Sequence, residues 1–233
     1  MNAKYFLPVA AVFLAACSDV TAPSNDLAVS YGKRTTTPPP PPSSLVLSES
    51  FENGIASVSS WNLNSLTSSP GTAKMASTGF LGRLLNEEVA LSIPAGMTSV
   101  TVSFDLYIIG TWDGAGQQGY GGDWWQIEVS RNGGARQNVF HTSFSNQATK
   151  PQHFPKEVTA GTSPSDKGAF ATNLLGYPKA SGKFDVGDAI YKLKYTISNP
   201  GGGPLVLYFH STTPLQDLND ESWGLDNVVV SGS

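Results

Sequence analysis

The feature that most constrains the fold of this 233-residue chain is a two-residue alternation of apolar and polar side chains, which recurs in short runs. In 99–109 every second residue from Val100 to Ile108 is apolar, and 189–198 and 205–209 show the same period. Successive side chains of a β-strand point to opposite faces, so this period predicts strands with one buried and one polar face. Further β-rich runs are 45–51, 88–93, 124–130, 138–144 and 224–231.

Turn-forming residues separate these runs. The chain has 24 Gly and 16 Pro but only 14% charged residues, which argues against coiled coils and helical bundles. The turns RNGG (131–134) and NPGGG (199–203) are predicted to be hairpin connections. The segment 79–90 has two Leu and a Glu at helix-like positions, but its glycines and the strand pattern that follows favour a bent strand.

Eight or more short strands within one domain predict an all-β fold. We expect an antiparallel two-sheet β-sandwich of the jelly-roll type, because each run has one apolar and one polar face. The segment 145–188 has weak periodicity and is too long for a bare loop in a compact domain. It is predicted either to contain short strands around 168–175 and 183–186 or to be a functional loop.

The N-terminus resembles that of a bacterial lipoprotein. Residues 1–16 combine Lys4 with about twelve apolar residues, too few for a membrane span of about 20 residues. Small residues directly precede Cys17, as in the lipobox, where the cysteine becomes lipidated after cleavage. The alternative is an ordinary secretory signal with a chance cysteine. Ser18, rather than Asp, follows the cysteine and favours the outer membrane.

Residues 17–44 are predicted to be a tether between the lipidated Cys17 and the folded domain. The segment is rich in Pro, Thr and Ser and has too few apolar residues to fold. The five prolines at 38–42 favour a stiff polyproline II spacer. The jelly-roll domain is therefore expected at 45–233, exported and lipid-anchored to a bacterial membrane, on the outer-membrane or periplasmic side. Since Cys17 is the only cysteine, the domain has no internal disulfide.

Charge and motifs exclude several classes of function. The net charge of −4 gives no basic stripe for nucleic acid. The sequence lacks a GxSxG elbow, an HExxH motif, a P-loop and a dinucleotide fingerprint. The histidines His141, His153 and His210 are scattered, and we expect them to be ordinary strand or surface residues. A non-catalytic protein is therefore predicted, with a hydrolase that has an unrecognised site as a remaining alternative.

Acidic residues near both ends of the domain suggest a structural calcium ion. Glu49 and Glu52 lie near its start, Glu221 and Asp226 near its end, and further acids lie around 113–123. Calcium binds 6–8 oxygen ligands. The first and last strands of a jelly roll are neighbours, so Glu52 and Asp226 are expected to approach one ion, with Glu49 and Glu221 as further candidates. The alternative is that these acids are turn formers and surface charge.

Aromatic side chains are the candidates for ligand binding. Trp124 and Trp125 are neighbours in a strand, so one is expected to point inward and the other outward. With Trp112 and Tyr120 they flank the glycine-rich loop 113–122 and could form a platform for sugar rings. Core packing is the alternative role of each tryptophan.

Several segments resemble a family of exported bacterial jelly-roll domains that look like carbohydrate-binding modules. They include FLGRLLNEEVALSI (80–93), FDLYIIGTWDG (104–114), GDWWQIEV (122–129) and, most specifically, DESWGLDNVVV (220–230). In similar calcium-bearing modules an acid of the early FE strand and the aspartate of the closing DNV strand hold the ion. The resemblance implies that Glu52 and Asp226 have these roles.

These patterns together predict a lipid-anchored, exported, non-catalytic binding module. We expect it to be stabilised by calcium and to bind glycan at the cell envelope. The alternative is a structural accessory subunit of a membrane or envelope protein complex, which docks through a sheet face or the 145–188 segment.

Overall fold

The structure of the chain is a computed structural model that describes residues 43–56, 58–63, 66–68, 79–116, 121–177 and 187–233. The predicted signal peptide, Cys17, most of the predicted tether, Tyr120 and the strand expected at 183–186 lie outside the described residues. No helix in the described part of the chain has the length and apolar character that a membrane crossing requires.

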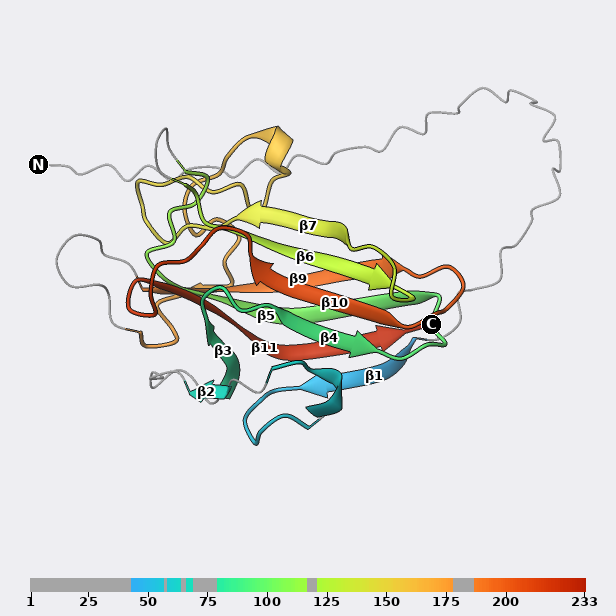
Figure 1. The fold of residues 1–233 in the computed structure, drawn as a ribbon. Helices are drawn as coiled ribbons and strands as arrows, with labels where there is room; N and C mark the ends of the chain where they lie inside the picture. The colour runs from blue at the N-terminus through green and yellow to red at the C-terminus, as the bar shows by residue number, and fades with distance from the viewer. Residues whose placement is uncertain (1–42, 57, 64–65, 69–78, 117–120, 178–186) are drawn as a thin grey trace, which may run out of the picture. The chain divides into compact units, whose positions relative to one another are not determined.

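Two antiparallel sheets form the domain, as the alternating pattern predicts (Figure 1). The larger sheet contains, in spatial order, β2 (Leu66–Ser68), β3 (Gly79–Leu84), β11 (Glu221–Gly232), β5 (Ser99–Gly110), β9 (Asp188–Ser198) and β8 (Ala171–Thr172), with β1 (Ser44–Glu49) also paired to β11. The smaller sheet contains β4 (Val89–Ile93), β10 (Leu205–Ser211), β6 (Trp124–Arg131) and β7 (Gln137–Ser143). The short 3₁₀ helices are η1 (Val58–Ser60) and η2 (Val158–Ala160).

The order of the strands is that of a jelly roll. The eight main strands form two four-stranded layers, β3-β11-β5-β9 and β4-β10-β6-β7, and the chain crosses repeatedly from one layer to the other. The first strand, β1, pairs with the last strand, β11, between Ser44 and Glu49. The predicted fold class is therefore confirmed, and so is the expectation that the first and last strands are neighbours.

One of the two predicted hairpins is correct and the other is wrong. RNGG joins β6 to β7, and Asn132 and Gly133 have φ values of 53° and 69°, as a tight hairpin turn requires. NPGGG joins β9 to β10, but these strands belong to different sheets, so this turn carries the chain across the sandwich. The predicted bent strand 79–90 likewise ends as β3 at Leu84, and the chain crosses to β4 in the other sheet.

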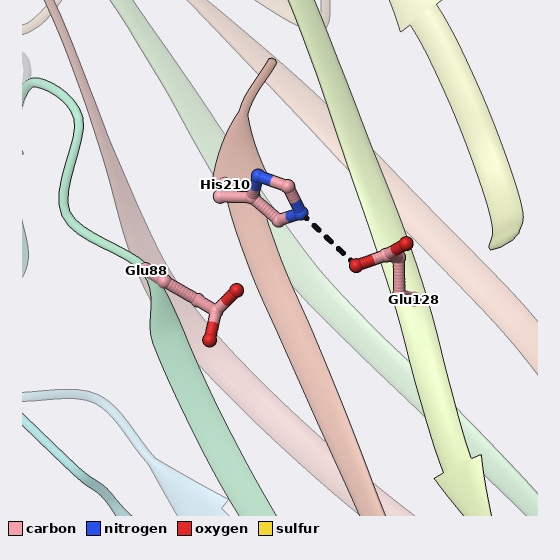
Figure 2. Close-up of side chains that lie close together, drawn as sticks. All are labelled: Glu88, Glu128 and His210. Carbon is pink, nitrogen blue, oxygen red and sulfur yellow. Dashed lines mark hydrogen bonds and ion pairs between the residues drawn. The ribbon is translucent and has the colours of Figure 1, made fainter. Parts of the chain in front are cut away.

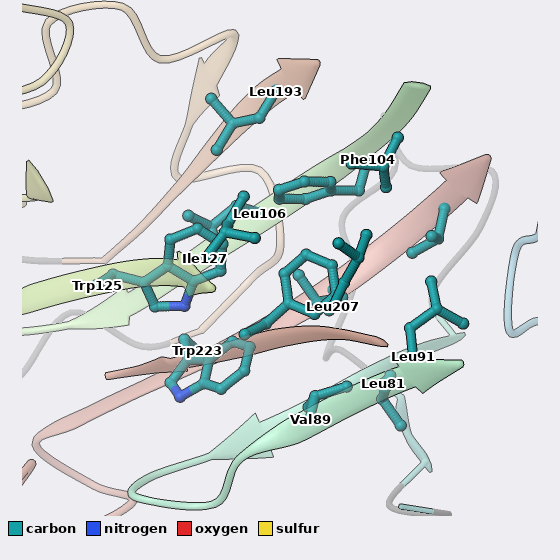
Figure 3. Close-up of a cluster of buried hydrophobic side chains, with 14 of the residues drawn as sticks. Leu81, Val89, Leu91, Phe104, Leu106, Trp125, Ile127, Leu193, Leu207 and Trp223 are labelled. Atoms are coloured by element: carbon teal, nitrogen blue, oxygen red, sulfur yellow. The ribbon is translucent and has the colours of Figure 1, made fainter. Parts of the chain in front are cut away.

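The core lies between the sheets and consists of the inward side chains of both (Figure 3). Trp125 of β6 packs edge-on against Trp223 of β11, with ring centroids 5.9 Å apart. The rings of Phe104 and Phe209 also pack against the Trp125 indole, with centroid distances of 6.0 Å and 6.2 Å. Because β6 and β10 belong to one sheet and β5 and β11 to the other, this aromatic cluster joins the two layers.

The described part of the segment between β7 and β9, residues 144–177, contacts both sheets. Its first part follows the end of β7, where the Phe154 amide donates to the Ser143 carbonyl. Leu175, near the end of this described part, lies on the outer face of the larger sheet in a second buried cluster with Tyr107 and Ile190. The short strand expected around 168–175 is present as the two-residue β8.

Candidate functional site

Trp112 and Trp125 do not form a ligand platform. Both side chains are fully buried, and the Trp112 indole donates to the Ser222 carbonyl at 3.0 Å. The expectation that they stack on sugar rings is therefore wrong, because Trp112 is held against β11 and Trp125 fills the core between the sheets. Tyr120 lies outside the described residues.

Trp124 is the outward member of the tryptophan pair, and it is half-buried on the outer face of the smaller sheet. Its indole stacks on the ring of His141 with centroids 4.7 Å apart and contacts His153 at the same distance. His153 is held beside β7 by the Ser143 hydroxyl at 3.0 Å. The three rings form one aromatic cluster at the β7 edge.

A groove of about 510 Å³ lies beside this cluster, along the edge strand β7. We call it the β7 groove. One wall is β7 itself, the other is the segment 154–159, and Tyr195 of β9 also lines it. Its full lining is Asn138, Val139, Phe140, His141, Phe154, Pro155, Lys156, Glu157, Val158, Thr159 and Tyr195.

The β7 groove combines aromatic rings with hydrogen-bonding groups. Phe140 packs on Tyr195 with centroids 4.8 Å apart, and Phe154 packs on Phe140 at 6.4 Å. Burial lowers the pKa of His141, and repulsion from His153 and His210 in their protonated forms lowers it further, so the His141 imidazole is neutral at pH 7. A neutral imidazole offers one donor and one acceptor to a ligand.

Sequence reasoning missed this groove. The run 138–144 was correctly identified as β-rich, but the groove also needs 154–159 and Tyr195, which are distant in the sequence. Only the polar positions Asn138 and His141 within a strand gave a local signal, and isolated polar residues of this kind are common on any exposed sheet face.

The four predicted calcium ligands do not all lie together. Glu52 and Asp226 come close, since the charge of Glu52 contributes to the raised pKa of Asp226. Glu49 is buried at the end of β1, opposite Val228 of β11, and its carboxylate accepts from the Ala56 backbone amide at 2.9 Å. Glu221 is five residues from Asp226 along β11, about 17 Å in an extended strand. The expectation that Glu221 shares this ion is therefore wrong.

Asp226 lies in a network of hydrogen-bond donors. The Tyr107 hydroxyl donates to Asp226 Oδ2 at 2.6 Å, and the backbone N–H of Asn227 donates to Asp226 Oδ1 at 2.7 Å. Burial raises the pKa of Asp226 to about 6, these donors oppose the rise, and the charges of Asp105 and Glu52 add to it. The carboxylates of Asp226, Asp105 and Glu52 thus lie near one another. Lys192 is bonded to Asp105 at 2.8 Å and supplies a positive charge at this place. Such an oxygen-rich, negatively charged place fits Ca²⁺.

Glu221 belongs to a second acidic group with Asp113, Asp123 and Asp220. Asp113, Asp123 and Glu221 line a hollow of about 250 Å³, which we call the acidic hollow. Burial and the charges of Asp123, Asp220 and Asp113 raise the pKa of Glu221 to about 9, and burial raises that of Asp123 to about 6. The Glu221 and Asp123 carboxyls hydrogen-bond to each other, which requires a shared proton.

This carboxyl pair does not have the geometry of a glycosidase. Glycosidase carboxyls are separated by about 5–9.5 Å, so that a sugar and a water molecule fit between them. Glu221 and Asp123 are within hydrogen-bonding distance of each other, which leaves no such space. The acidic hollow therefore gives no support to the hydrolase alternative.

No known protein family and no curated protein matches this chain. Among solved structures, it is similar to the K1 cleaved adhesin domain of Lys-gingipain from Porphyromonas gingivalis W83, with 17% identity, a TM-score of 0.39 and coverage of 80% of this chain and 98% of that one. The K3 cleaved adhesin domain of Lys-gingipain has 16% identity and a TM-score of 0.40, with coverage of 82% and 100%. CBM35 from Cellvibrio japonicus Abf62 has 9% identity and a TM-score of 0.34, with coverage of 80% and 93%. At these scores the likenesses carry no argument about ligands.

Proposed function

We propose that this protein is a non-catalytic binding module that recognises a glycan in the β7 groove. The observation that carries the proposal is a hollow of about 510 Å³ lined by both rings and hydrogen-bonding groups. Small-molecule sites typically have volumes of about 300–1,000 Å³ and combine apolar walls with a few polar groups. A sugar ring has an apolar face and a rim of hydroxyls, so both parts of this lining suit it.

The edge position of the groove also favours a chain-like ligand. The groove follows the last strand of the smaller sheet, and the Trp124–His141–His153 cluster continues the aromatic surface beyond it. Successive sugar units of an oligosaccharide could therefore contact the groove and the cluster in turn. His141 belongs to both surfaces, which makes it the central residue of the proposed site.

The exposed surface gives less support to the alternative of a protein-docking subunit. Large apolar side chains that are exposed in the described part of the chain are Leu45, Val158, Phe170 and Leu218. Only these four are exposed among the described residues, whereas a docking surface is expected to be a contiguous apolar patch of several hundred Å². Of the four, only Val158 lines the β7 groove.

Glycan binding can be tested with the full chain on a glycan array, followed by calorimetry with the best ligand. His141→Ala and Asn138→Ala are expected to weaken binding by at least about tenfold, since each removes a polar group from the groove. Gln216→Ala is the matched control, because Gln216 is polar and exposed but lines the acidic hollow. Binding that is lost in Gln216→Ala and retained in His141→Ala would contradict the proposal. Capture of an envelope protein that the groove variants leave intact would favour the accessory-subunit alternative.

We further propose that the module is exported and lipid-anchored through Cys17. The predicted signal peptide, the cysteine and the proline-rich tether support this proposal. Two or more acyl chains hold a protein stably on a membrane. Cys17→Ser is therefore expected to move the protein from the membrane fraction to the soluble fraction of the cells that express it. Unchanged fractionation would contradict lipid anchoring.

Calcium is proposed to bind beside Glu52 and Asp226 and to stabilise the domain by mass action. Melting of the full chain in calcium and in excess chelator tests this proposal. The calcium-dependent rise in melting temperature is expected to disappear in Asp226→Asn and to remain in Glu221→Gln. The opposite result would place the ion at the acidic hollow, and no calcium dependence in the unmodified chain would exclude a stabilising ion.

A further inference from the structure

The outer face of the smaller sheet brings together two glutamates and a histidine (Figure 2). His210 is on β10, Glu128 is on the neighbouring strand β6, and Glu88 directly precedes β4 on the other side of β10. The two carboxylates therefore approach the imidazole from opposite sides. One ligand atom of each residue lies within 4.8 Å of the others, and all three side chains are half-buried.

We propose that Glu88, Glu128 and His210 form a binding site for a divalent transition metal ion of the Zn²⁺ type. Zinc takes imidazole nitrogen and carboxylate oxygen at about 2.0–2.2 Å, so neighbouring ligand atoms around it are about 3.3 Å apart. His210 Nε2 and Glu128 Oε2 are already 3.3 Å apart. Calcium suits this place less, because it requires 6–8 oxygen ligands.

Hydrogen bonds around His210 leave the nitrogen that faces the glutamates free to accept. Nδ1 lies 3.1 Å from the Ser211 carbonyl, which can only accept, so Nδ1 carries the proton. Asn138 donates to the Gln126 Oε1 at 2.8 Å, which turns the Gln126 amino group toward His210 Nε2 at 2.9 Å. In metal sites a ligating histidine likewise donates its second ring nitrogen to a carbonyl or carboxylate.

This tautomer places two acceptors against each other. In this tautomer no proton lies between the Nε2 lone pair and the Glu128 carboxylate, which are 3.3 Å apart, whereas a doubly protonated His210 would donate to Glu128. A cation bound to both atoms would replace this repulsion with two favourable contacts. The Gln126 amino group would then leave Nε2, while its amide oxygen keeps the bond from Asn138.

Arg136 supplies the positive charge in the structure itself. Its guanidinium binds Glu88 through two bonds of 2.5 Å and 2.9 Å, lies 3.6 Å from Glu128, and covers the Tyr208 ring at 3.6 Å. Arg136 is exposed and lies between the β6–β7 turn and β7, so it can leave without disturbing the core. A metal ion would compete with this guanidinium for Glu88, and the competition provides a distinctive test.

The test is a Zn²⁺ titration of the full chain, purified without a polyhistidine tag, by calorimetry with excess Ca²⁺ present. His210→Ala is expected to weaken Zn²⁺ binding by at least about 100-fold, and Glu128→Gln and Glu88→Gln by about tenfold each. Arg136→Gln is expected to tighten binding several-fold, because no guanidinium then competes. His141→Ala is the matched control. This histidine lies opposite Gln126 in the β6–β7 ladder, but it does not belong to the group of Glu88, Glu128 and His210.

Each variant is first melted without zinc, so that loss of binding is not confused with loss of fold. Substitution of Co²⁺ gives a second readout, because its visible absorption is strong in a four- or five-coordinate protein site and should fall to that of hydrated Co²⁺ in His210→Ala. The proposal is overturned if the unmodified chain binds no Zn²⁺, if His141→Ala loses binding and His210→Ala does not, or if Arg136→Gln weakens it. The test is independent of the glycan proposal, since His141→Ala should lose glycan and keep zinc.

Discussion

The first half of β11 carries two buried carboxyl groups, and at pH 7 one is mostly ionised and the other is protonated and neutral. Asp226 is 2% exposed and Glu221 is 5% exposed, so burial penalises the charge of each. The pKa of Asp226 is about 6, whereas that of Glu221 is about 9. Asp226 is therefore mostly ionised at neutral pH, and Glu221 is protonated.

The difference comes from the neighbours. Asp226 faces donors, the Tyr107 hydroxyl and the Asn227 amide, which stabilise its negative charge. Glu221 faces the carboxyls of Asp123, Asp220 and Asp113, which oppose its charge. Two acids of similar burial on one strand thus differ in protonation: Asp226 is mostly an ionised acceptor, and Glu221 is a protonated hydrogen-bond donor.

Glu221→Gln replaces the protonated carboxyl with a group that does not titrate, and we expect it to have the largest effect of these variants on the free energy of unfolding. The folded pKa of Glu221 lies above its ordinary 4.5, so its contribution to stability is complete below that pH and is lost as the pH rises toward 9. A glutamine amide donates to Asp123 at every pH. Relative to the unmodified chain, the variant should gain on the order of 3 kcal/mol between pH 5 and pH 9, discounted for water in the acidic hollow.

Urea unfolding at pH 5, 7 and 9 in the presence of chelator measures this change. Glu157→Gln is the control, because Glu157 is exposed and its substitution should leave the pH dependence unaltered. A pH profile of Glu221→Gln that parallels the unmodified chain would show that Glu221 is not held protonated.

Asp226→Ala probes the other half of the comparison. The substitution leaves the buried Tyr107 hydroxyl without its acceptor and removes the bond from the Asn227 amide. An unsatisfied buried donor costs about 1–3 kcal/mol, so the unfolding free energy should fall by roughly 2 kcal/mol.

Tyr107→Phe provides the control for Asp226→Ala. If the hydroxyl–carboxylate bond carries the effect, the double variant should lose less than the sum of the two single variants. Additive losses, measured by urea unfolding in chelator, would contradict a direct interaction between the two side chains.

The strands were predictable because their information is local. Alternation places Trp124 and Trp125 on opposite faces, and the structure confirms that one is outward and one inward. The rest of the strand also says which is which, because Trp125 shares its face with the apolar Ile127 and Val129, whereas Trp124 shares its face with Gln126 and Glu128. The turn NPGGG likewise indicates a reversal of the chain, but it does not say whether the next strand joins the same sheet or the opposite one.

The sites were less predictable because they depend on pairing. Asp226 and Glu221 are close in sequence, yet the extended strand separates them and gives each a different set of neighbours. Asp123 reaches Glu221 only through the jelly-roll crossings, and His210 meets Glu88 and Glu128 only because β10 lies between β4 and β6. Composition gave the kinds of residue available, and strand order decided which of them meet.

Lys192→Met should sharpen the comparison with the smallest effect on stability. Lys192 bonds both carboxylate oxygens of Asp105, at 2.9 Å and 2.8 Å, but its side chain is 51% exposed. An exposed ion pair of this kind contributes less than about 1 kcal/mol to the free energy of unfolding and is screened by salt.

The substitution should also change the pKa of Asp226. The charge of Asp105 already contributes to the raised pKa of Asp226. Without the Lys192 ammonium group to compensate that charge, the pKa of Asp226 should rise above 6. NMR titration of the Asp226 carboxyl in low salt measures this shift, with Lys194→Met on the same strand as the control. A pKa that stays at its original value would mean that Tyr107 and Asn227 alone keep Asp226 ionised.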